Sequence, residues 1–68
     1  MDALKLGRAM IRRVARQAYD SNVAKHGHEN AIWQARREGA LFIIDADDEA
    51  LGDYLQQQLE MFLTELNT

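Results

Sequence analysis

The absence of both cysteine and proline limits the fold of this 68-residue chain more than any other feature of its sequence. Without cysteine, the chain can form neither disulfides nor thiolate metal sites, which often support very small domains. Without proline, no position forbids a helix, and none of the four glycines adjoins another. We therefore predict an all-α fold that depends on packing and on association for its stability.

The spacing of the hydrophobic residues predicts three helices, two long and one shorter. Residues 2–25 carry an apolar residue every three or four positions, with Asp2 as the N-cap. Gly27 should end this helix, because glycine readily adopts the left-handed conformation found at helix ends. A shorter helix is expected from residue 29, and a second long helix over residues 48–66. The apolar stripe of the last helix consists of Leu51, Leu55, Leu59, Phe62 and Leu66.

Residues 39–45 are ambiguous. Gly39 should interrupt the middle helix, and the apolar run 40–44 that follows is compatible with a buried helix or a strand. We favour a helix, because a lone strand needs a partner strand and no other segment predicts one. The alternative is a two-stranded ribbon that this segment forms between two copies of the chain.

The apolar content of the chain, 47%, is high for its length. A domain this small buries only about 60% of the surface that its unfolded chain exposes, so a monomer would leave apolar side chains in water. We therefore expect residues 1–68 to form a single helical domain, a small three-helix bundle completed by homodimerisation. The candidate interface anchors are the large apolar side chains Trp33, Phe42, Ile43 and Phe62.

Charge is strongly segregated along the chain. Residues 1–38 hold all eight basic residues and four acidic ones, a formal balance of +4, whereas residues 39–68 hold seven acidic residues and no basic one, a balance of −7. Arg8, Arg12 and Arg16 recur every four residues and should form one ridge of the first helix. We call this ridge and its neighbours the basic face: Lys5, Arg8, Arg12, Arg13 and Arg16.

Three interpretations of this segregation remain open. The acidic last helix could pack beside the basic first helix and neutralise it, within a chain or between chains. The basic face could instead bind a partner protein, whose complementary charges would steer the encounter. It could also bind the phosphates of a nucleic acid, but the net charge of −3 is unusual for a nucleic-acid-binding domain. We therefore favour a non-catalytic regulator or adaptor that binds protein, with nucleic-acid binding as the alternative.

Candidate chemical sites are weak. His26 and His28 could share a metal only with a third ligand that the sequence does not supply, so they are better interpreted as solvated turn residues. The carboxylates of residues 45–49 lack the spacing of a calcium loop and are better explained as helix caps. No nucleophile has a nearby base, and no glycine-rich phosphate loop occurs. We expect no catalysis, no metal and no cofactor.

No stretch approaches the roughly 18 apolar residues of a membrane span, and the first residues lack the pattern of a signal peptide. We therefore expect no membrane partner and a cytoplasmic location, with which the lack of cysteine agrees. No motif marks a known family. The small size and the acidic composition without cysteine or proline are typical of small regulators from bacteria or phages.

Overall fold

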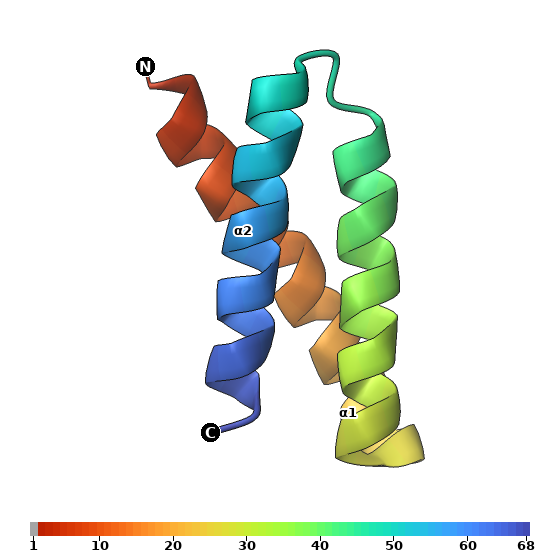
Figure 1. Cartoon of the computed structure of the whole chain (residues 1–68). Helices are drawn as coiled ribbons and strands as arrows, with labels where there is room; N and C mark the ends of the chain where they lie inside the picture. Colours follow the sequence, from red (N-terminus) through yellow and green to blue (C-terminus); the bar gives the residue numbers. More distant parts are fainter. Residues whose placement is uncertain (1) are drawn as a thin grey trace.

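The computed structural model describes residues 2–68, and its helices are α1 (Ala3–Ile44) and α2 (Glu49–Leu66). No strand occurs in this part of the chain, so the predicted all-α class is confirmed. The predicted number of helices is wrong, because the first and middle predicted helices are joined into the single helix α1. Figure 1 shows that α1 folds back on itself at its yellow turn and that α2 lies against both halves.

The reversal within α1 occurs at Gly27, where the sequence predicted that the first helix would end. Gly27 has φ 86° and ψ 170° and is the one residue with positive φ among residues 2–68. Glycine takes this conformation without the steric penalty that a Cβ atom would bring. Gly27 divides α1 into a first arm, residues 3–26, and a second arm, residues 28–44.

The predicted interruption at Gly39 is wrong. The second arm remains helical through Gly39 to Ile44, which also excludes the strand alternative for this segment. A Cβ atom on Gly39 would lie 2.6 Å and 2.8 Å from the two methyl carbons of Leu59. Gly39 is therefore explained by the close approach of the second arm to α2.

Aspartate side chains cap the N-termini of both helices. The Asp2 carboxylate accepts a hydrogen bond from the Leu4 backbone N–H at 2.9 Å, as predicted. The Asp48 carboxylate accepts one from the Ala50 backbone N–H, also at 2.9 Å. Each carboxylate satisfies an amide at the positive end of the helix dipole. The predicted capping role of the acidic segment 45–49 is thus confirmed at Asp48.

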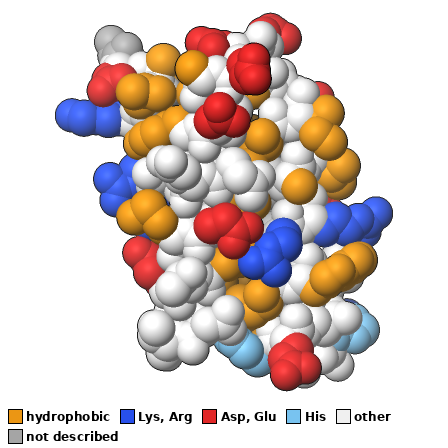
Figure 2. Space-filling view, viewed as in Figure 1, with side chains coloured by type: hydrophobic (Ala, Val, Ile, Leu, Met, Phe, Trp, Pro, Cys, Tyr) orange, Lys and Arg blue, Asp and Glu red, His pale blue; other side chains and the backbone are white. Residues whose placement is uncertain are grey.

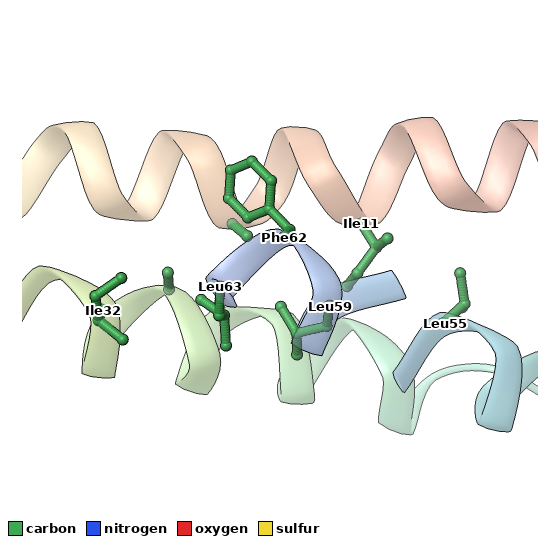
Figure 3. Packing of buried hydrophobic residues seen from close by; sticks show 8 residues of the cluster. Ile11, Ile32, Leu55, Leu59, Phe62 and Leu63 are labelled. Carbon is green, nitrogen blue, oxygen red and sulfur yellow. The ribbon is translucent and has the colours of Figure 1, made fainter. Parts of the chain in front are cut away.

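The hydrophobic core receives side chains from both arms and from α2. In Figure 3, Phe62 points from α2 toward the first arm, while Ile32 approaches from the second arm. Much of what the arms contribute is small alanine, so α2 supplies most of the core's large side chains. The buried hydrophobic residues are Ile11, Ala15, Ala31, Ile32, Ala35, Leu55, Leu59, Phe62 and Leu63.

A small polar network ties the end near Gly27 together. The Tyr19 hydroxyl and His28 Nδ1 are 2.8 Å apart, and His28 Nε2 is 2.8 Å from Asn67 Oδ1. These contacts join the first arm, the second arm and the C-cap of α2. His28, predicted as a solvated turn residue, is exposed but also cross-links the three segments.

Candidate functional site

The basic face is divided between internal contacts and solvent. Arg12 forms a two-pronged ion pair with Glu65 of α2, with nitrogen–oxygen distances of 2.8 Å and 3.1 Å. The guanidinium groups of Arg12 and Arg16 also lie 5.5 Å and 5.1 Å from the centroid of the Phe62 ring. These two arginines therefore pack against α2.

The other residues of the basic face stay exposed. Lys5, Arg8 and Arg13 take part in no ion pair within residues 2–68. Arg13 also points away from the ridge of its neighbours, because successive residues of a helix are about 100° apart. The structure thus groups Lys5, Arg8, Arg12 and Arg16 and separates Arg13 from them.

The ion pair with Arg12 changes the titration of both partners. The hydrogen bond from Arg12 lowers the pKa of the Glu65 carboxyl, and the same bond raises the pKa of Arg12. Both groups are held in their charged forms. A second pair, Arg36–Glu60 at 3.1 Å, also joins α1 to α2. The predicted contact between the acidic last helix and the basic first helix is therefore seen at Arg12–Glu65, whereas Arg36–Glu60 joins α2 to the second arm.

The remaining acidic residues of the C-terminal half gather at the opposite end from Gly27. In Figure 2 their red side chains cover the upper end, over the loop and the start of α2. They form no ion pair within residues 2–68. These residues are Asp45, Asp47, Asp48, Glu49 and Asp53.

The four candidate anchors occupy three different environments. Phe62 is buried in the core, and Phe42 and Ile43 are half-buried against it. Trp33 is 55% exposed, and its ring lies 5.9 Å from the guanidinium carbon of Arg37. Of the four, only Trp33 presents most of its side chain to solvent.

Trp33 belongs to an exposed row along the second arm, which we call the outer stripe: Trp33, Arg37, Leu41 and Ile44. Spacings of four, four and three residues place these side chains on one helix face. That face lies opposite the buried positions Ala31, Ala35 and Gly39. In Figure 2, hydrophobic and basic side chains follow one another along the right-hand edge, over the second arm. Leu41 and Ile44 were not predicted as surface residues, although their spacing from Trp33 is visible in the sequence.

A second candidate surface is the groove between the two arms of α1. At the end near the acidic loop it forms a cleft of about 360 Å³ in which Leu6 and Met10 of the first arm face Phe42 of the second. The floor of this cleft is Leu51 and Leu55 of α2. Toward Gly27 the groove becomes polar and is lined by Val14, Gln17, Ala18, Ser21, Asn22, Gln34 and Glu38. Leu6 and Met10 were not predicted as surface residues.

Within residues 2–68, no group of three or more His, Cys, Asp or Glu side chains could hold a metal ion. In the same part of the chain, no helix combines the length and the hydrophobicity needed to cross a membrane. Comparison with protein-family models, curated proteins and solved structures found no match to this chain.

Proposed function

We propose that the protein is a non-catalytic regulator or adaptor that binds another protein through the outer stripe of the second arm. The observation that carries this proposal is the exposure of Trp33, Leu41 and Ile44 on one helix face, where Ile44 is 74% exposed. Tryptophan and arginine are the residues most enriched among those that dominate protein interfaces. The outer stripe places one of each side by side.

The second arm is apolar on two opposite faces. Ala31, Ile32 and Ala35 turn inward to the core, while Trp33 and Ile44 turn outward to solvent. A helix of a small protein that needs only one buried face usually carries polar residues on the other. The outward apolar residues therefore support a binding surface that a partner covers.

The exposed charges would serve the same function. Lys5, Arg8 and Arg13 give the first arm unpaired positive charge, and the acidic loop gives one end negative charge. Charges outside the centre of an interface mainly speed and orient the encounter rather than supply its affinity. The proposal also includes a cytoplasmic location, a helical bundle formed by the two arms of α1 with α2, and a homodimer.

The test is affinity capture from cell extract with the intact chain and two variants of matched exposure. Trp33→Ala removes an apolar side chain from the outer stripe, and Met61→Ala removes one that is 51% exposed on α2. We expect at least one protein whose retention survives nuclease treatment, falls about tenfold or more with Trp33→Ala and is unchanged with Met61→Ala. Equal retention by both variants would contradict the outer stripe as the binding surface.

Nucleic-acid binding through the basic face is the alternative function, favoured by the exposure of Lys5, Arg8 and Arg13. Arg12 is already paired with Glu65, which reduces the number of cations free to contact phosphates. Retention on DNA or RNA that weakens steeply with salt, and that is lost in the combined variant Arg8, Arg12 and Arg16→Glu, would favour this alternative. No salt-sensitive retention of the parent protein would exclude it.

A further inference from the structure

The groove between the two arms of α1 carries exposed apolar side chains that the outer stripe does not include. Met10 is 42% exposed and Leu6 is exposed to a similar degree, although both line the apolar end of the groove. A groove between two antiparallel helices is a common docking place for further helices. Its position opposite α2 leaves room for another pair of helices on this side of the molecule.

We propose that a second copy of this chain docks on the groove. The two arms of one copy then stack face to face on the two arms of the other, which gives a four-helix arrangement. This inference rests on the homodimer proposed above and assigns it a surface and a symmetry axis. Trp33 and Arg37 do not line the groove, so this part of the outer stripe stays free in this arrangement, whereas Leu41 lies one helical turn from Glu38 at the edge of the groove. The same protein could then hold its copy and a partner protein at once.

The distribution of apolar residues along the groove selects the symmetry axis. Met10 and Phe42 share the apolar end, whereas Val14 and Glu38 share the polar end. The distance along the groove from Met10 to Val14 in the first arm therefore matches the distance from Phe42 back to Glu38 in the second arm, because the two arms run in opposite directions. A two-fold axis across the groove would lay the apolar end of one copy on the polar end of the other. An axis along the groove instead brings the two apolar ends together, and it stacks the first arm of each copy on the second arm of the other.

This axis also matches charges. Arg13 follows Met10 by three residues and precedes Gln17 by four, so it lies on the groove side of the first arm. Glu38 lines the groove from the second arm, at about the same height as Val14. Both side chains are exposed, and neither belongs to an ion pair within residues 2–68. Stacking the first arm on the partner's second arm places Arg13 of each copy over Glu38 of the other.

Four-helix arrangements of this kind place apolar residues inside and opposite charges at the edges of facing helices. Two Arg13–Glu38 pairs related by symmetry would fix the register of the two copies. A two-fold axis across the groove loses the apolar contact between the two copies. A second copy can therefore cover the apolar end of the groove and pair its exposed charges with the chain's own residues.

Sedimentation equilibrium of the full chain tests this arrangement. At micromolar concentration we expect about twice the 7.8 kDa mass of one chain. Met10→Lys should raise the dimer dissociation constant about tenfold or more, because it places a charge in the apolar contact. Met61→Lys, at comparable exposure on α2, should leave it unchanged, and circular dichroism should show that both variants stay helical. A monomeric parent, or equal effects of the two lysines, would overturn the proposal.

A charge-exchange experiment tests the axis itself. Arg13→Glu and Glu38→Arg each create like-charged pairs across the interface, so each variant alone should dimerise about tenfold or more weakly than the parent. An equimolar mixture should recover dimers of nearly parental strength, since each mixed dimer contains two opposite-charge pairs. A contact within one chain cannot produce this recovery. A mixture that only averages the two variants would overturn this interface, while leaving both the homodimer and the outer stripe as separate proposals.

Discussion

Gly39 and Gly52 both lie inside helices, but only Gly39 faces another helix at close range. A Cβ atom on Gly39 would meet the Leu59 methyl groups at under 3 Å, whereas one on Gly52 would meet nothing closer than Ile43 Cγ2 at 3.9 Å. We predict that Gly39→Ala lowers the free energy of unfolding by about 1–3 kcal/mol, through overpacking. Gly52→Ala should raise it by up to about 1 kcal/mol, because alanine favours the helix more than glycine does.

Urea denaturation of the two alanine variants, with the parent alongside, checks this prediction. The two substitutions add the same methyl group, so any difference in their effects comes from the surroundings. If both variants shift the unfolding midpoint in the same direction, the close contact between Gly39 and Leu59 is not present in solution.

The Arg12–Glu65 pair predicts how stability depends on pH. Because Arg12 lowers the pKa of Glu65 in the folded protein, this carboxylate stabilises the fold above its unfolded pKa. That contribution disappears as the pH falls through the lowered folded value. Between about pH 6 and pH 3, the parent should therefore lose more stability than Glu65→Gln does.

Urea midpoints at several pH values measure this difference. Asp53→Asn is the control, because Asp53 is exposed and forms no ion pair within residues 2–68. This control should lose stability on acidification as the parent does. Identical pH profiles for the parent and Glu65→Gln would show that the ion pair contributes nothing measurable.

Residues whose role is local could be predicted from the sequence, and residues whose role depends on distant contacts could not. Asp2 was predicted as an N-cap because capping involves only the next few residues. Gly39 was misinterpreted as a helix break, since the reason for a glycine there is Leu59, twenty positions away. Arg12 was placed on the basic face with pairing to the acidic helix as one open interpretation, but nothing in the local pattern indicates that its partner is Glu65.

At the scale of the helices, the start of α2 depends on one carboxylate in an acidic segment. Asp48 accepts the Ala50 N–H bond, while its neighbour Asp47 is exposed and caps nothing. We predict that Asp48→Ala destabilises the protein by about 0.5–2 kcal/mol and that Asp47→Ala has at most a few tenths of that effect. Thermal unfolding followed by circular dichroism compares the two. Equal losses would mean that general charge, rather than the cap, stabilises this end of α2.

The helical spans followed from hydrophobic periodicity, but the number of helices did not. The 3.6-residue pattern located both arms and α2. It could not show that the second arm would begin directly after Gly27 without an intervening loop, so that both arms belong to one element with a kink at this glycine. The outer stripe was overlooked for a related reason: periodicity detects the apolar face of a helix, and the second arm has two such faces.

At the scale of the whole molecule, some charges of the basic and acidic halves form ion pairs with each other, and the others stay unpaired. Arg12–Glu65 and Arg36–Glu60 connect the basic α1 to the acidic α2. The free carboxylates gather near the loop, and the free cations of the basic face lie on the first arm. Some of the segregated charges therefore hold α1 against α2. The unpaired charges are available to contact a second copy or a partner protein.

Trp33 is the only tryptophan of the chain, so its fluorescence reports directly on the outer stripe. The most direct test of the proposed function is the emission spectrum of the full chain, with and without a protein captured through the Trp33-dependent assay. We predict emission typical of an indole in water for the chain alone, unchanged on dilution from dimer to monomer, and a shift to shorter wavelength when the partner binds. Binding of the partner without any shift in this emission would contradict the outer stripe as the site of partner binding.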